Sequence, residues 1–145
     1  MITLQIECDK TKMPNIEKKW IHKICNYILL DYKHSDAIIT IIFSNDKQLQ
    51  ELKNKYFSQN VLTDTISFNL EEKGDPIDGE IYISLERVAE NAKLYKQKFD
   101  KEIKRVIIHS ILHLTGINDQ TEDEKNRMTI LENFYLSKNL NNTLA

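Results

Sequence analysis

The chain has 145 residues, of which 41% are hydrophobic and 29% are charged, with a formal net charge of −2. This composition is typical of a globular protein, and the length suits one domain over residues 1–145. The slight excess of acidic residues excludes a global positive field that would attract nucleic acid, so any such contact needs a local basic face. No apolar run approaches the ~20 residues of a membrane span, and the N-terminus lacks the pattern of a signal peptide. We therefore expect a cytoplasmic protein without membrane contact.

The two cysteines, Cys8 and Cys25, each lie within an apolar segment and lack the CxxC spacing of a metal or redox site. We expect both to be buried, reduced thiols, with a disulfide as the less favoured alternative. Neither lies near the histidine motif described below, so neither is expected to bind a metal ion.

The first half of the chain alternates between strand and helix patterns. Residues 2–7 alternate apolar and polar side chains, the period of a half-buried strand, and the run AIITIIF within 36–43 is rich in β-branched residues. Between them, apolar residues recur at helical spacing after Pro14, which suits a first helical turn. We therefore predict a strand at 2–7, a helix from Pro14 to about Leu30, a strand at 36–43, and a helix capped by Ser44 or Asn45 that ends near Tyr56.

Three local signals divide the second half. A loop at 71–78 separates two short strand patterns. Gly116 supplies a left-handed helix end, and Thr121 with Glu124 has the spacing of a capping box. We predict strands at 64–68 and 79–84, helices at 85–97 (capped by Ser84), at about 100–114 and from 121 to about 136, and a frayed end at 139–145.

The predicted element order is βαβαββααα. Such an order is typical of an α+β (α/β-like) fold, in which a single mixed sheet of about four strands is packed with helices.

The stretch HSILHLTGIND, residues 109–119, has the spacing of a metal site. Histidines four residues apart lie on one face of a helix, so His109 and His113 can bind one ion. Gly116 ends the helix and turns the chain back, which lets Asp119 supply a third ligand. Three protein ligands leave a tetrahedral ion with an open position for water, which the ion activates. The motif therefore predicts a catalytic zinc ion, or a similar divalent metal, used for hydrolysis.

Two other interpretations of the motif remain open. The histidines could be hydrogen-bonded parts of a metal-free core, although the other face of the helix, with Ile103, Val106 and Ile107, provides core without them. The spacing also occurs in zinc peptidases, but in their HExxH pattern a glutamate acts as the general base, and that position is Ser110 here.

Three blocks of the sequence resemble the YbeY family of bacterial rRNA-maturation endoribonucleases. The family's HGxLHLxGxxH block reads HSILHLTGIND here, its TDVLSF block reads TDTISF at 63–68, and its GDI-type strand reads GEIYIS at 79–84. The order and spacing of the blocks agree, and the resemblance covers most of the chain, with the weakest agreement in the N-terminal half. The histidine block is the most specific of the three.

The sequence departs from the family pattern at three positions. The third metal position is Asp119 instead of histidine, which preserves a zinc ligand but can alter metal preference. Ser110 replaces a glycine after the first histidine. The family's arginine before the TDVLSF block aligns with Phe57, and residues 56–62 include no basic residue. Lys53 and Lys55 are therefore the candidates for contacting phosphate.

The resemblance implies a single-strand-specific endoribonuclease that acts in 16S rRNA maturation and ribosome quality control. Its implied partners are single-stranded RNA, rRNA precursors, the ribosomal small subunit and a ribosome-associated GTPase. The catalytic residues are then His109, which holds the ion, and Glu80, which orients a ligand, holds a water or acts as a base. Asp64 would hydrogen-bond groups around the site. The simpler alternatives are a surface acid beside a turn for Glu80 and a loop cap for Asp64.

Basic residues on several helices are further candidates for lining an RNA-binding groove, although each is individually more typical of a solvated helix face. They are Lys18, Lys19 and Lys23 on the first helix, Arg87, Lys93 and Lys96 on the third, and Lys101, Lys104 and Arg105 near the motif. A non-catalytic ribosome-assembly factor with a structural metal site is the remaining alternative. The missing arginine favours it, but structural zinc sites usually have four protein ligands and the motif offers three.

Overall fold

The structure, a computed structural model, describes residues 1–72, 74–138 and 140. The predicted order βαβαββααα is confirmed. The predicted fraying of residues 139–145 concerns residues that lie, except for Leu140, outside this described part. The strands are β1 (Ile2–Cys8), β2 (Ala37–Ser44), β3 (Thr65–Asn69) and β4 (Ile77–Ser84), and the helices are α1 (Lys18–Asp31), α2 (Asp46–Phe57), α3 (Leu85–Leu94), α4 (Phe99–Leu114) and α5 (Glu122–Leu136).

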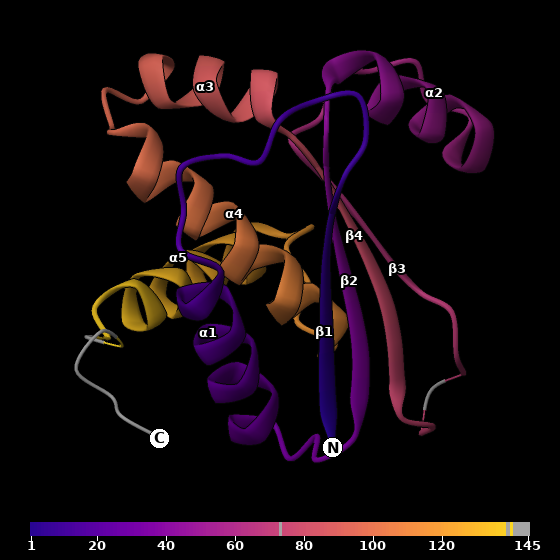
Figure 1. The fold of residues 1–145 in the computed structure, drawn as a ribbon, viewed down its shortest axis with the longest axis vertical. Helices are drawn as coiled ribbons and strands as arrows, with labels where there is room; N and C mark the ends of the chain where they lie inside the picture. The colour runs from indigo at the N-terminus through magenta and orange to yellow at the C-terminus, as the bar shows by residue number, and fades with distance from the viewer. Residues whose placement is uncertain (73, 139, 141–145) are drawn as a thin grey trace.

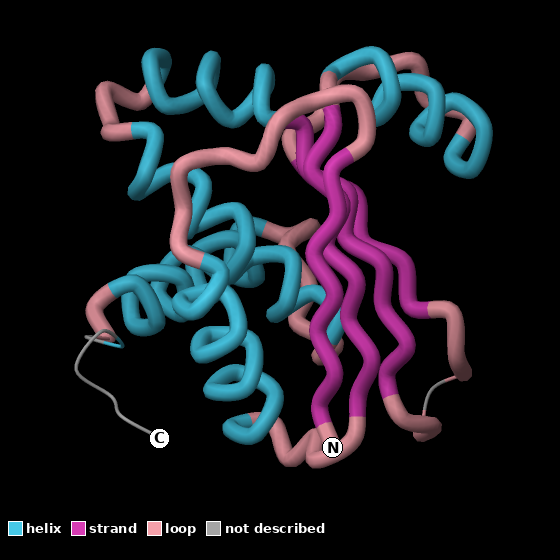
Figure 2. Tube along the Cα trace, viewed as in Figure 1, coloured by secondary structure: helices cyan, strands magenta, loops and turns pink. Residues whose placement is uncertain are grey.

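The four strands form one mixed sheet in the order β1-β2-β4-β3, which confirms the predicted α+β fold (Figures 1 and 2). β1, β2 and β4 are parallel, whereas β3 runs antiparallel to β4 and forms one edge of the sheet. Two long connections join the parallel strands, as parallel pairing requires, and each contains a helix. The edge formed by β3 borders the site described below.

Helices α1, α4 and α5 pack together on one side of the sheet, with α4 in contact with both other helices (Figure 1). α4 is mostly apolar, and Ile103, Ile107 and Ile111 on it are fully buried. On β4, Ile81 and Ile83 face the same core, so residues of odd number point toward α4.

Gly79 on β4 lies close to the end of α4. A methyl group added there would lie 2.5 Å from Leu114 Cδ1 at the end of α4. A glycine at this position therefore lets the last turn of α4, which carries His113, lie directly against the strand.

Three predicted boundaries were wrong. The first helix begins at Lys18 instead of Pro14, because the Ile16 N–H donates to the Pro14 carbonyl (2.8 Å) in a turn before the helix. β4 begins at Ile77, inside the predicted loop, because this buried residue pairs with β2. α3 ends at Leu94 instead of Gln97, because Lys96 has a positive φ of 55° that a right-handed helix cannot contain.

The two cysteines differ in environment. Cys25 is fully buried within α1, and burial raises the pKa of its thiol to about 12. Cys8 is exposed, so the prediction of two buried thiols was wrong for this residue, which is the last of an edge strand. Both thiols are free.

None of the helices in the described part of the chain has the length and hydrophobicity that a membrane crossing requires.

Candidate metal centre

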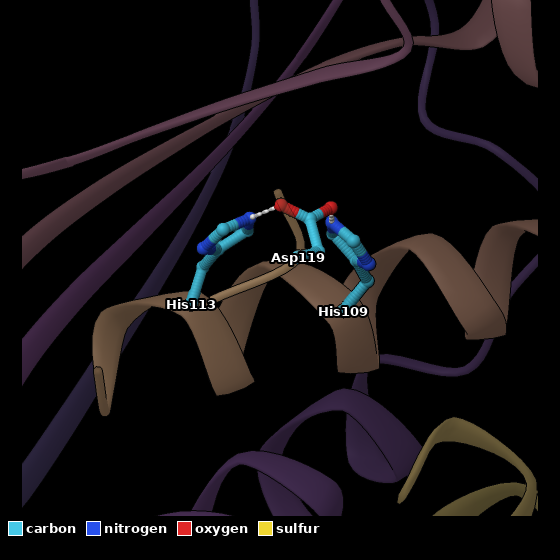
Figure 3. Close-up of side chains that lie close together, drawn as sticks. All are labelled: His109, His113 and Asp119. Atoms are coloured by element: carbon cyan, nitrogen blue, oxygen red, sulfur yellow. Dashed lines mark ion pairs between the residues drawn. The ribbon is translucent and has the colours of Figure 1, made fainter. Parts of the chain in front are cut away.

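His109 and His113 lie one turn apart at the end of α4, and the centroids of their rings are 4.9 Å apart. The helix ends at Leu114, and Gly116 has a φ of +102°, the positive value predicted for this turn. Its N–H donates to the His113 carbonyl (3.0 Å). The following residues return toward the helix, so that Asp119 faces both imidazoles (Figure 3).

The three side chains bring one donor atom each to a common point. Asp119 Oδ2 lies 3.3 Å from His109 Nε2, and Asp119 Oδ1 lies 3.1 Å from His113 Nε2 (Figure 3). One ligand atom from each residue lies within 4.8 Å of the others. Bonds of about 2.0–2.1 Å at tetrahedral angles place two ligand atoms roughly 3.4 Å apart, so the donor set and its spacing fit a zinc-like ion.

A fourth group, which sequence reasoning missed, contacts His109 on the side away from Asp119. Glu132 on α5 is buried, and its Oε2 lies 2.7 Å from His109 Nδ1. Its other oxygen accepts a hydrogen bond from Arg105 (2.8 Å), which also donates to Asn133 (2.9 Å). A carboxylate can only accept, so Nδ1 of His109 carries the proton in this contact, and the Nε2 lone pair is available for an ion when the ring is neutral.

The charges around the two histidines shift their pKa values in opposite directions. Burial alone would lower the pKa of His109, but the hydrogen bond and charge of Glu132, with Asp119 and Asp64, outweigh it and raise the pKa. Burial and the neighbouring His109 lower the pKa of His113. Because its pKa is lowered, His113 gives up its proton more readily than His109. A metal ion binds only the neutral form of an imidazole.

The metal-ligand candidates line a cleft with a volume of about 1220 Å³ that also reaches β3 and α2. Its charged lining is mainly acidic. Among the residues that the structure describes, Lys53 and Arg105 are its basic residues apart from histidines, and the acidic ones are Asp64, Glu72, Asp75, Glu102, Asp119 and Glu132. This excess of carboxylates favours binding of a cation in the cleft and opposes binding of a bare phosphate group.

Asp64 lies in this cleft beside β3. Burial raises the pKa of its carboxyl, despite the opposing charge of His109. Asn91 Nδ2 donates to it (3.4 Å), and its backbone carbonyl accepts from the Ser84 N–H (2.9 Å). Asp64 thus lines the cleft, and its backbone connects the start of β3 to the end of β4.

Ser110 points away from the cleft centre and connects α4 to the sheet. It is fully buried, its hydroxyl donates to the Val106 carbonyl (2.8 Å), and its oxygen lies 2.8 Å from Thr65 Oγ1 on β3. The serine thus strengthens the packing of α4 against the edge strand and lies away from the position of a general base.

The structure does not bring Glu80 to the metal centre. Glu80 does not line the cleft and lies beside Phe68 in the sheet register, on the face of β4 opposite to α4. The alternation of GEIYIS, with its isoleucines in the core, is the signal that could have placed this glutamate on the far face.

The candidate phosphate-binding lysines are separated by the structure. Lys53 lines the cleft, whereas Lys55 does not and lies over the ring of Tyr56. Of the nine other basic residues named from the sequence, all within the described part of the chain, Arg105 alone lines the cleft, and it is paired with Glu132.

Known proteins are similar to this chain over most of its length. Residues 3–139 match the family model described as endoribonuclease YbeY. Proteins named endoribonuclease YbeY from Phocaeicola vulgatus and Bacteroides thetaiotaomicron are 39% and 35% identical, over 92% and 91% of this chain and 94% of each relative. The solution structure of TM1509 from Thermotoga maritima is similar at a TM-score of 0.64, with 25% identity, and the match covers 92% of this chain and 87% of that one.

Proposed function

Since this chain belongs to the endoribonuclease YbeY family, we propose that it is a metal-dependent hydrolase that cleaves single-stranded RNA during rRNA processing. The observation that carries the proposal is the convergence of His109, His113 and Asp119 in a cleft. A single core cluster, shared by the sheet and the helices, supports the further proposal that residues 1–145 act as one domain.

The residues that would hold the ion are His109 and His113 through Nε2 and Asp119 through its carboxylate. Zinc is the proposed ion, because two imidazoles, one carboxylate and an open fourth position are typical of catalytic zinc sites. Such an ion supplies Lewis acidity, which polarises a phosphodiester and activates water for attack. The open position also argues against a purely structural site.

The surrounding side chains prepare this site for its substrate. Glu132 accepts a hydrogen bond from the Nδ1–H of His109 and so fixes the tautomer and the ring orientation, while Arg105 holds Glu132 in place. Asp64 lines the same cleft, and burial raises the pKa of its carboxyl. Lys53 is placed to balance the charge of the phosphate backbone.

The biological setting is proposed from the family resemblance. The substrate would be an rRNA precursor, in 16S rRNA maturation and ribosome quality control in the cytoplasm. The expected partners are the small ribosomal subunit and a ribosome-associated GTPase.

A peptidase function finds no support in the geometry. The position of the peptidase glutamate is Ser110, whose hydroxyl is engaged with Val106 and Thr65 inside the core. RNA hydrolysis is therefore the function to test first.

The test is to compare bound zinc and RNA cleavage in matched histidine and aspartate variants. His113→Ala and Asp119→Ala should each lose most bound zinc, measured by mass spectrometry of purified protein, and cleavage of a labelled single-stranded RNA. His22→Ala, which removes an exposed histidine of α1, is the control and should retain both.

Two results would contradict the proposal. Unchanged zinc content in both variants would refute the ligand assignment. Full zinc loss with undiminished RNA cleavage would show that a contaminating nuclease, and not this site, cuts the RNA.

A further inference from the structure

Large apolar side chains are exposed along the segment that connects α2 to β3 and continues past β3. Tyr56 and Phe57 at the end of α2 are 57% and 43% exposed, Val61 and Leu62 are 46% and 50% exposed, and Leu70 is 58% exposed. An exposed apolar patch that adjoins a functional cleft commonly marks a binding surface.

Three aromatic rings of this segment form an ordered group, here called the aromatic platform: Tyr56, Phe57 and Phe68. Phe57 stacks on Phe68, with ring centroids 5.8 Å apart and an interplanar angle of 17°, and Tyr56 meets Phe68 edge to face at 5.4 Å. Phe68 belongs to β3 and is also supported by Tyr82 of β4 at 6.1 Å. The rings are therefore positioned by the sheet before any ligand binds.

Cationic groups accompany the platform. Lys53 Nζ lies 4.6 Å from the centre of the Phe57 ring, and Lys55 Nζ lies 5.1 Å from the centre of the Tyr56 ring. Phe57 and Lys53 both line the cleft that contains His109 and His113, so the platform reaches this cleft at Phe57. Phe68 lies beside Glu80 in the sheet register, on the face opposite to α4. Apolar rings beside ammonium groups match the two parts of a nucleotide, its base and its phosphate.

We propose that the aromatic platform binds single-stranded RNA by stacking of unpaired bases on Phe57 and Tyr56, while Lys53 and Lys55 leave the faces of these rings and contact the adjacent phosphates. This inference rests on the proposed function and names how the substrate is recognised. The cleft is mainly acidic, and Phe57 occupies the position where the family resemblance places an arginine. Stacking thus compensates for a missing charge, and it selects single strands because the bases of a duplex already stack on each other.

The experiment measures binding of fluorescein-labelled RNA to the full chain by fluorescence anisotropy, with a chelator present to prevent cleavage. Phe57→Ala and Phe57→Leu should weaken binding of a single-stranded RNA by about 10-fold to 100-fold, as expected for the loss of one stacked base. Phe57→Trp should retain binding. An abasic ribose-phosphate oligomer of the same length and an RNA duplex should bind all four proteins alike.

Phe134→Ala is the matched control. Phe134 on α5 is 46% exposed, lies 5.0 Å from the ring of Tyr135, and has Lys138 Nζ 4.0 Å from its centre, but it does not line the cleft. Removal of this ring should leave binding of the single-stranded RNA unchanged.

The outcomes separate this inference from the proposed function. If Phe57→Ala binds single-stranded RNA as the wild type does, while the wild type cleaves RNA and His113→Ala does not, stacking is refuted and the nuclease function stands. Retained binding in Phe57→Leu would mean that the ring contributes only apolar area, which also refutes stacking. If the wild type neither binds nor cleaves RNA, both proposals fail.

Discussion

A single buried carboxylate decides which nitrogen of His109 faces the proposed ion. Glu132 occupies the Nδ1 side, and its second oxygen is held by Arg105, so that neither group of this buried ion pair is left without a partner. Pairs of this kind contribute orientation more reliably than stability, because the cost of burying the charges offsets much of their attraction. Changes to Glu132 should therefore be detected first in metal binding.

We predict that Glu132→Gln lowers zinc affinity by about 10-fold to 100-fold, the usual effect of removing a carboxylate that orients a metal-binding histidine. The glutamine keeps the shape of the side chain, but its neutral amide accepts the hydrogen bond from His109 more weakly and lacks the charge that holds Arg105. Competition with a fluorescent zinc chelator measures the affinity.

Glu90→Gln, which changes an exposed glutamate of α3, is the control for this measurement and should bind zinc as the wild type does. Glu132→Asp should recover part of the affinity. Equal zinc affinity for Glu132→Gln and the wild type would show that His109 is oriented by its packing alone.

The metal-ligand candidates could be predicted from the sequence because they lie within eleven consecutive residues, 109–119, where helix periodicity and one glycine determine their relative positions. Glu132 could not be predicted, because its contact with His109 depends on how α5 packs against α4. A partial signal existed. Glu132 lies on the same side of α5 as the buried Met128 and Tyr135, where an acidic residue needs a buried partner.

At the scale of elements, the turn after α4 determines the position of Asp119. Gly116 has a φ of +102°, and no atom lies within 4 Å of the position that an added methyl group would occupy. An alanine there would therefore cause backbone strain but no steric clash. Gly74 has a φ of +101° and equally open surroundings, in a loop that carries no candidate ligand. The two glycines are thus a matched pair.

We predict that Gly116→Ala and Gly74→Ala each lower the free energy of unfolding by about 1–2 kcal/mol, the cost of a left-handed conformation for an L-residue. Urea unfolding of the zinc-free proteins measures this cost. Only Gly116→Ala should also weaken zinc binding, because the altered turn moves Asp119 relative to His113. A similar loss of zinc affinity in Gly74→Ala would show a general effect of destabilisation instead.

Helix starts were predictable where a side chain caps them. Asn45, Ser84 and Thr121 each accept a hydrogen bond from a backbone N–H of the first turn, and Thr121 with Glu124 forms the predicted capping box. The start of α1 was not predictable, because Glu17 occupies its N-cap position without a side-chain hydrogen bond. The order of strands in the sheet also lay beyond the sequence pattern, since pairing of β2 with β4 depends on contacts between distant segments.

Across the whole molecule, the distribution of charge does not favour strong electrostatic attraction of RNA. The net charge is −2, the cleft lining is mainly acidic, and several basic residues are paired with carboxylates, such as Arg87 with Asp46 and Lys104 with Asp100. If two lysines of α2 contact phosphates, few counterions are released on binding.

We therefore predict a weak salt dependence of RNA binding by the metal-free protein. Each neutralised phosphate of a single strand contributes a slope of about −0.7 to log K against log salt concentration, so two lysines give about −1.4. Anisotropy titrations over a range of KCl concentrations measure the slope. A value steeper than about −4 would require more phosphate contacts than the two lysines provide and would point to a different, more basic RNA-binding surface.

The different environments of the two cysteines give the natural chain a built-in position for a chemical probe. Because the Cys25 thiol is enclosed in α1 and holds its proton to a pKa of about 12, a maleimide dye at neutral pH would react at Cys8 alone. A fluorophore could thus be attached at the end of β1 without introducing a new cysteine. Energy transfer from it to a labelled RNA would report where the RNA lies on the protein surface.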